Sequence, residues 1–157
     1  MKKIFPYIYI FILVAIDQLI KFLCLIKLKH LGSITIIKDF FYLTYVENRG
    51  AAFGIFEGAR FIFVLIGIIA IIFCMIYYNN VSKNEHSFTI LWKISLIIIP
   101  AGAIGNIIDR VFRRYVIDMF HFNFFGKDFA VFNFADILIC TGVFLLSICI
   151  IFSKDKK

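Results

Sequence analysis

Apolar residues fill four stretches of the chain that are each long enough to cross a membrane. These stretches cover residues 4–25, 61–78, 88–108 and 131–152. About 20 apolar residues in a helix span the ~30 Å hydrocarbon core of a bilayer. The pattern therefore predicts an all-α membrane protein with four transmembrane helices, and an even number of spans places both chain ends on the same side.

Two longer connections, residues 26–60 and 110–130, share the opposite side of the predicted membrane. The first contains two runs rich in β-branched and aromatic residues, 33–37 and 40–46, which is typical of strands. Its aromatic residues suit a position at the membrane–water interface. We expect a small β-rich layer between helices 1 and 2 that covers a site or clamps an extended peptide by strand pairing.

Composition agrees with a membrane protein and with one domain spanning residues 1–157. Hydrophobic residues make up 62% of the chain, charged residues 17%, and the mean hydropathy is +0.96, whereas ordinary globular chains are roughly 45–50% apolar. The net charge is +7, but the basic residues are scattered among apolar runs and form no stripe suited to nucleic acid. Contact with anionic lipid headgroups explains them more simply.

The N-terminus begins Met1-Lys2-Lys3 before an apolar run, which mimics a secretory signal. No small-residue cleavage site follows, and Asp17 and Lys21 interrupt the run, so we expect an uncleaved anchor.

Charge counting leaves the orientation of the spans open. Basic residues favour the cytoplasmic side, and Lys2 and Lys3 before the first span place the chain ends there. The side with the two long connections nevertheless carries more basic residues, namely Lys27, Lys29, Lys38, Arg49, Arg60, Arg110, Arg113, Arg114 and Lys127.

The residue types narrow the possible chemistry to carboxylates. The four cysteines lie in or beside apolar runs without CxxC pairing, which favours packing roles. No HExxH or GxSxG motif occurs, and the histidines lack metal-ligand spacing, so we expect no metal and no cofactor. Asp118 and Asp136 lie beside membrane-length apolar runs, where a carboxylate is expensive. Two converging carboxyls that share one proton could act as acid and base on a peptide bond.

Other polar residues gather near the same ends of the predicted helices. Asp17 and Lys21 are spaced i, i+4, while Asn106 and Asp109, like Asn133 and Asp136, are spaced i, i+3, so each pair shares one helix face. Arg110 follows as a possible charge partner, and small-xxx-small steps in 101–105 predict close helix packing. The turn after the second β-like run, with Asn48 and Gly50, allows a close backbone approach to a substrate. Scattered structural polar residues would not all lie at one level, so this clustering predicts a site.

Five short motifs resemble the lipoprotein signal peptidase family, also called signal peptidase II, in their order and spacing. They cover essentially the whole chain: Asp17-Gln18-Leu19-Ile20-Lys21, Asn48-Arg49-Gly50-Ala51-Ala52-Phe53, Gly105-Asn106-Ile107-Ile108-Asp109-Arg110, Val116-Ile117-Asp118 and Phe132-Asn133-Phe134-Ala135-Asp136. Met119 stands where the family more often has Phe.

The resemblance implies an intramembrane aspartic endopeptidase of the bacterial cytoplasmic (inner) membrane. Such enzymes remove signal peptides from diacylglyceryl-modified prolipoproteins, cutting before the lipidated cysteine, and are blocked by globomycin-type inhibitors. The family's catalytic pair maps to Asp118 and Asp136. Its substrate-binding or dyad-supporting positions map to Asp17, Lys21, Asn48, Gly50, Asn106, Asp109, Arg110, Asn133 and Ala135. Family topology places both termini in the cytoplasm, the β-rich layer outside it, and the site towards the outer leaflet among membrane lipids.

Two other classes of function are compatible with intramembrane polar residues. A small ion or proton carrier would also use them, and it predicts carboxylates at several depths. A non-catalytic assembly module built on small-xxx-small packing predicts that the two aspartates are dispensable.

Overall fold

The computed structural model describes residues 4–50, 58–81 and 88–152 of the chain. In this part it has four helices, α1 (Phe5–Leu28), α2 (Arg60–Val81), α3 (Thr89–Phe112) and α4 (Phe134–Phe152). Each is long and apolar enough to cross a membrane. The prediction of four spans is confirmed.

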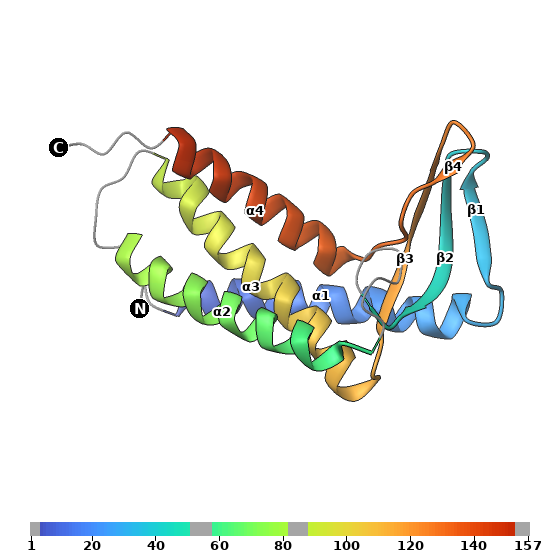
Figure 1. Cartoon of the computed structure of the whole chain (residues 1–157), viewed down its shortest axis with the longest axis horizontal. Helices are drawn as coiled ribbons and strands as arrows, with labels where there is room; N and C mark the ends of the chain where they lie inside the picture. The colour runs from blue at the N-terminus through green and yellow to red at the C-terminus, as the bar shows by residue number, and fades with distance from the viewer. Residues whose placement is uncertain (1–3, 51–57, 82–87, 153–157) are drawn as a thin grey trace.

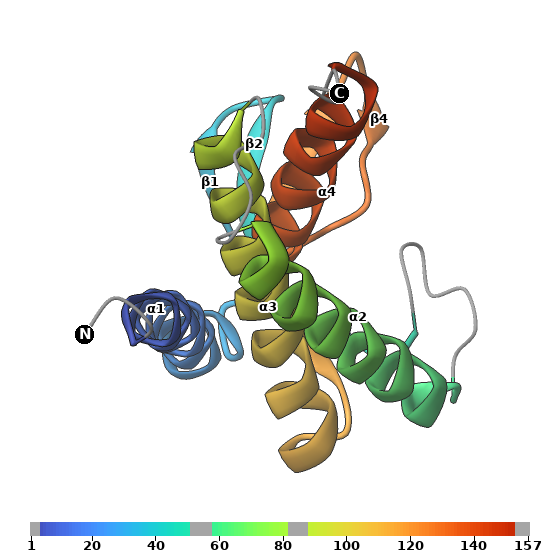
Figure 2. The same cartoon turned by 90° about the vertical axis from the view of Figure 1, so that its left-hand side faces the viewer.

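The helix α3 lies at the centre of the bundle, and α1, α2 and α4 each pack against it (Figure 2). Small residues of α3 permit the closest approaches. A Cβ atom at Gly102 would collide with the carbonyl oxygen of Ala135 and would come within 2.8 Å of Ile139 Cγ1, both on α4. The small-xxx-small spacing therefore serves helix packing, as the sequence predicted.

The start of α1 and the end of α4 lie at one end of the bundle, and a β-sheet covers the other end (Figure 1). The strands β1 (Ser33–Ile37), β2 (Phe41–Asn48), β3 (Val116–Phe124) and β4 (Lys127–Asp128) are ordered β1-β2-β3-β4, and neighbouring strands are antiparallel. The two predicted strand runs correspond to β1 and β2. The layer is larger than predicted, because the connection between α3 and α4 contributes β3 and β4.

The strand β3 alternates its side chains between two environments, as a strand must. Ile117 and Met119 are buried against Cys24 and Leu28 of α1. Asp118 therefore points to the opposite face, and it is still only 1% exposed. One extra residue in β2, between the Leu43–Phe120 and Val46–Asp118 pairs, forms a bulge beside this aspartate.

Two helix boundaries differ from the hydropathy pattern for reasons that affect the site. α3 continues to Phe112, beyond the predicted end at 108, so Asp109 and Arg110 lie inside its last turns. α4 begins at Phe134 and not at 131, because Phe132 is paired with Phe120 of β3 through backbone hydrogen bonds of 2.8 and 3.1 Å. That pairing brings the start of α4 next to Asp118.

Candidate active site

A reciprocal cap forms the N-terminus of α4 and orients Asp136. The Asp136 amide donates to Asn133 Oδ1 at 3.0 Å, and the Asn133 amide donates to Asp136 Oδ2 at 3.1 Å. This is the geometry of a capping box, in which the capping residue and the third helical residue satisfy each other's backbone N–H. The i, i+3 spacing of these residues thus reflects a cap that holds the carboxylate in place.

Asp118 is held by two side-chain amides that come from distant parts of the chain. Asn133 Nδ2 donates to its Oδ1 at 2.6 Å, and Asn48 Nδ2 donates to its Oδ2 at 2.8 Å. Asn133 therefore contacts both aspartates. Because both carboxylates accept hydrogen bonds from this one residue, Asp118 and Asp136 are held near each other, although one belongs to a strand and the other to a helix.

Both carboxylates line one cavity of about 550 Å³ at the junction of the sheet and the helices. The wall on the helix side is apolar and includes Ile137 and Cys140 of α4. A second hollow of about 480 Å³ shares Asn48, Gly50 and Asp118 with this cavity and extends along β2 and β3. The two together form a cleft that is apolar at one end and polar at the other, with Asp118 lining both parts.

Burial changes the titration of Asp118. It raises the pKa of this carboxyl to about 7 from its usual 3.8, and the negative charge of Asp136 acts in the same direction. The hydrogen bonds from Asn48 and Asn133 and the charge of Lys21 oppose this rise. At neutral pH the Asp118 carboxyl can therefore carry a proton.

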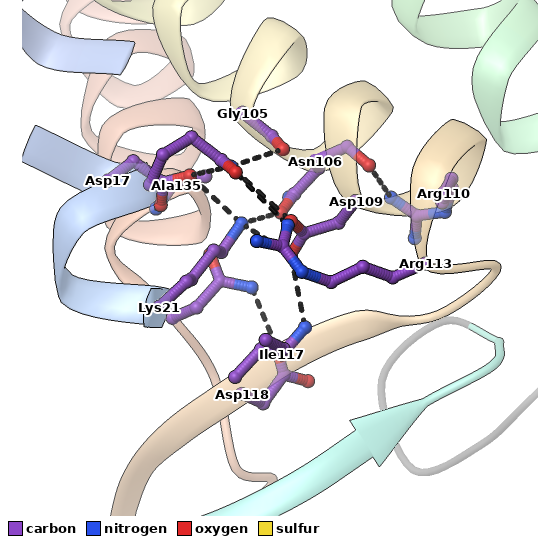
Figure 3. A network of polar contacts seen from close by, with 12 residues as sticks. Asp17, Lys21, Gly105, Asn106, Asp109, Arg110, Arg113, Ile117, Asp118 and Ala135 are labelled. Atoms are coloured by element: carbon purple, nitrogen blue, oxygen red, sulfur yellow. Dashed lines mark hydrogen bonds and ion pairs between the residues drawn. The ribbon is translucent and has the colours of Figure 1, made fainter. Parts of the chain in front are cut away.

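A buried ion network of Asp17, Lys21, Asp109 and Arg113 lies near Asp118 (Figure 3). Lys21 Nζ lies 3.0 Å from Asp17 Oδ2 and 3.2 Å from Asp109 Oδ2, and the lysine side chain is only 1% exposed. Arg113 forms an ion pair with the other oxygen of Asp109. Two cations thus balance two anions, which is the condition for keeping such charges away from water.

This network contacts the candidate dyad through one asparagine. Lys21 Nζ donates to Asn106 Oδ1 at 3.0 Å, and Asn106 Nδ2 donates to Asp136 Oδ1 at 2.8 Å. The ammonium group can only donate, so it determines which end of the Asn106 amide faces Asp136. The role of Lys21 in the geometry is therefore to orient a donor towards Asp136.

The same network also anchors the backbone on both sides of the site. Asp17 Oδ1 accepts the Ala135 amide of α4 at 3.0 Å, and Asp109 Oδ2 accepts the Ile117 amide of β3 at 3.1 Å. Gly105 permits the first contact, because a Cβ atom there would collide with the Asp17 carboxylate. The residues that precede Asp118 and Asp136 are thus held by buried carboxylates.

The remaining predicted residues close the cleft on the side of β2. Asn48 Oδ1 accepts the Gly50 amide at 2.9 Å, and the Gly50 carbonyl accepts a hydrogen bond from Arg110 Nη2 at 3.3 Å. The Arg110 guanidinium interacts electrostatically with both Asp118 and Asp136. The structure therefore brings all eleven residues selected from the sequence into one continuous network. Residues 51–53 of the same motif lie outside the described residues.

Sequence reasoning missed two members of this network and misjudged one cysteine. Gln18 Nε2 donates to Asp17 Oδ2, the Gly105 carbonyl and Asp109 Oδ1 at 3.1 to 3.3 Å, while its Oε1 accepts from Arg113 at 3.1 Å. The available signals were adjacency of Gln18 to Asp17 and the i, i+4 spacing of Arg113 from Asp109. Cys24, Cys74 and Cys149 are buried packing residues as predicted, but Cys140 is exposed and lines the cavity.

Carboxylates and amides dominate the chemistry of this site. Within residues 4–50, 58–81 and 88–152, no group of three histidine, cysteine, aspartate or glutamate side chains has the geometry to hold a metal ion. The arrangement instead offers two carboxyls with different surroundings, one asparagine that donates to both through its backbone and side-chain N–H groups, and a neighbouring guanidinium.

Comparison with known proteins gives a consistent match over the length of the chain. A family model described as signal peptidase (SPase) II matches residues 9–152. A lipoprotein signal peptidase of Clostridium acetobutylicum is 44% identical over 150 residues, covering 92% of each chain, and one of Clostridioides difficile is 38% identical, covering 94% of this chain and 95% of that one. A solved bacterial membrane enzyme structure is 31% identical, superposes with a TM-score of 0.81, and is matched over 93% of this chain and 87% of its own.

Proposed function

The chain belongs to the signal peptidase II family of membrane proteases, and from this premise we propose that it cleaves diacylglyceryl-modified prolipoproteins before the lipidated cysteine, using Asp118 and Asp136. The observation that carries the proposal is the shared Asn133, which hydrogen-bonds both carboxyls beside one cavity. Family membership supports the substrate class.

Each aspartate has a distinct role in the proposed reaction. Asp118, whose pKa is raised to about 7 by burial, carries the shared proton and donates it towards the scissile carbonyl oxygen. Asp136 lies in the first turn of α4, where the helix macrodipole stabilises negative charge. It is the base, and it takes a proton from the water that attacks the carbonyl carbon.

The resulting diol collapses as the carbon–nitrogen bond breaks. The proton held by Asp136 passes to the departing nitrogen, so the products are the carboxylic acid of the signal peptide, which then ionises to solvent, and the free amine of the lipidated cysteine. Asp118 regains its proton from the diol, which restores the starting state of the pair. The titration belongs to the two carboxyls together.

The two ends of the cleft suit the two parts of such a substrate. The apolar wall with Ile137 and Cys140 would accept lipid or an apolar side chain, and the sheet side would hold an extended peptide. In the proposed orientation in the membrane, the sheet and the site face the outer leaflet and both chain ends lie in the cytoplasm. A globomycin-type cyclic peptide would occupy the cleft.

An ion or proton carrier is the less favoured function. It predicts carboxylates at several depths, whereas Asp17, Asp109, Asp118 and Asp136 meet at one end of the helices. Their contacts are with fixed amides and cations, which suits a positioned reaction centre.

The test is cleavage of a purified diacylglyceryl-modified prolipoprotein by the protein in lipid. Asp118→Asn and Asp136→Asn should each lower turnover by at least about a hundredfold, since a positioned acid or base contributes roughly 10²–10⁴. Asp39→Asn, an exposed aspartate in a turn, is the matched control and should keep normal turnover. Near-normal cleavage by either dyad variant, with thermal unfolding unchanged, would reject the assignment.

A further inference from the structure

Several basic residues at the sheet end of the molecule have a function inside the fold. Lys29 lies 3.3 Å from Glu47, Arg113 pairs with Asp109, and Arg110 lies in the candidate active site. In the part of the chain that the structure describes, no carboxylate lies within ion-pair distance of Arg60 or Arg114. Among these described residues, therefore, no acidic side chain balances either charge, and neither arginine has a role in the proposed cleavage.

Arg60 and Arg114 line one hollow of about 300 Å³ together with Arg49, Gly58 and Phe61. The three arginines come from distant segments, directly after β2, at the first residue of α2 and just beyond α3. Only Arg49 has an acidic neighbour among the described residues, Glu47 at 3.7 Å. Three guanidinium groups around one hollow repel each other unless an anion joins them.

The hollow lies at the N-terminal end of α2, a helix long and apolar enough to span a membrane. Arg60 opens the apolar helix α2, and its guanidinium lies over the ring of Phe61 at 4.7 Å. Phe61 is 74% exposed, so an apolar surface stays available beside the charges. The N-terminal end of α2 adds its own positive partial charge. A ligand that is anionic at one end and apolar at the other fits this combination.

We propose that Arg49, Arg60 and Arg114 bind the phosphate of an anionic membrane phospholipid, whose glycerol and acyl chains lie against Phe61. Guanidinium groups match phosphate oxygens through paired hydrogen bonds, which makes arginine the preferred residue for this contact. The exposed ring and the position at the start of a span favour a lipid phosphate over a free one. The hollow shares Arg49 with the sheet side of the cleft, but none of its lining residues lines the cavity that holds both carboxyls.

The test uses the intact protein in nanodiscs of mixed phosphatidylcholine and phosphatidylglycerol, with native mass spectrometry counting the lipids that stay bound. Arg60→Gln and Arg114→Gly should each lower the preference for phosphatidylglycerol about fivefold, which is the effect expected for one basic residue at a charged surface. Arg114 has a φ of 71°, a conformation that glycine adopts freely. Arg114→Gly therefore removes the charge without threatening the fold.

The matched control is Lys38→Gln with Lys127→Gln, which removes two charges from the same end of the molecule but outside the hollow. If this pair lowers the preference as much as Arg60→Gln with Arg114→Gly, the effect is general surface charge and the site is rejected. An unchanged preference in the arginine pair rejects it as well. Displacement of phosphatidylglycerol by inorganic phosphate at equal concentration would reject the lipid as ligand.

Discussion

Asn133 offers a test of how the cap of α4 and the candidate dyad depend on one another. Its Oδ1 accepts the Asp136 amide at 3.0 Å, and its Nδ2 donates to Asp118 at 2.6 Å. Asn133→Ala removes both contacts. Asn133→Ser keeps an oxygen that can cap the helix, because serine is as good a capping residue as asparagine, but it removes the amide that donates to Asp118.

The two contacts have different expected energies. Loss of an N-cap costs about 1 kcal/mol, and loss of a hydrogen bond to a charged group costs about 1.5–3 kcal/mol. With Asp118 ionised, Asn133→Ser should therefore destabilise the fold by about 1.5–3 kcal/mol, and Asn133→Ala by about 1 kcal/mol more. Unfolding should be compared above pH 8, where Asp118, whose pKa is about 7, is ionised in the folded protein. Burial raises this pKa, so the stability that the protonated carboxyl contributes is lost as the pH rises through about 7.

The same substitution should move the pH profile of cleavage. The Asn133 amide stabilises the ionised form of Asp118, so its removal raises the pKa of Asp118 further. A loss of 1.5–3 kcal/mol corresponds to about 1–2 pKa units. If Asp118 must hold a proton, the alkaline limb of the profile moves to higher pH by this amount, even where the maximal rate falls.

The assay is kcat/KM for a diacylglyceryl-modified substrate as a function of pH, since this ratio reports groups of the free enzyme. Asn123→Ser is the matched control, because Asn123 donates to Asp128 on the sheet and not to the dyad. Two outcomes would refute the reasoning. One is an alkaline limb in Asn133→Ser that coincides with the wild type, and the other is equal unfolding free energies for Asn133→Ser and Asn133→Ala.

Three further substitutions test the buried ion network, the close packing at Gly105 inside α3, and the backbone at Arg114 just after α3. Lys21→Met should destabilise the fold by about 3–5 kcal/mol in unfolding assays and abolish cleavage, because it leaves buried carboxylates without their cation. The control Lys29→Met removes an exposed ion pair and should change stability by under about 1 kcal/mol. Gly105→Ala should cost about 1–3 kcal/mol by overpacking, while Gly67→Ala, whose methyl would meet only the flexible end of a side chain 2.9 Å away, should be near neutral by the same measurement. Arg114→Gly should raise the unfolding free energy by about 1 kcal/mol, because its φ of 71° is strained for any residue with a Cβ, and an unchanged value would contradict this.

The helices were predictable because membrane spans have a strong signal in composition and length. The strand β3 was not predicted, although residues 120–124 alternate phenylalanine with polar side chains in the way that a strand does, because the segment was treated only as a link between helices. The start of α4 was placed too early for a related reason. Hydropathy does not distinguish apolar residues paired to a strand, such as Phe132, from those inside the helix.

The site was predictable as a set of residues but not as a set of contacts. Spacings of three and four identify side chains on one helix face, and this rule placed Asp17 with Lys21 correctly. Contacts between elements depend on helix rotation and depth, which short spacings do not encode. The link from Lys21 through Asn106 to Asp136 is of this kind, and so is the bond from Asn48 to Asp118.

The charge count was ambiguous because it treats every basic residue as a free charge. Lys29 and Arg49 lie beside Glu47, Arg113 pairs with Asp109, and Arg110 faces the two aspartates of the cleft. A basic residue that folds together with an acidic partner contributes little net charge to the loop that carries it. The excess of basic residues on the sheet side therefore largely reflects structural pairing and, in our proposal, a bound lipid phosphate. Without those residues the count no longer opposes an orientation with both chain ends in the cytoplasm.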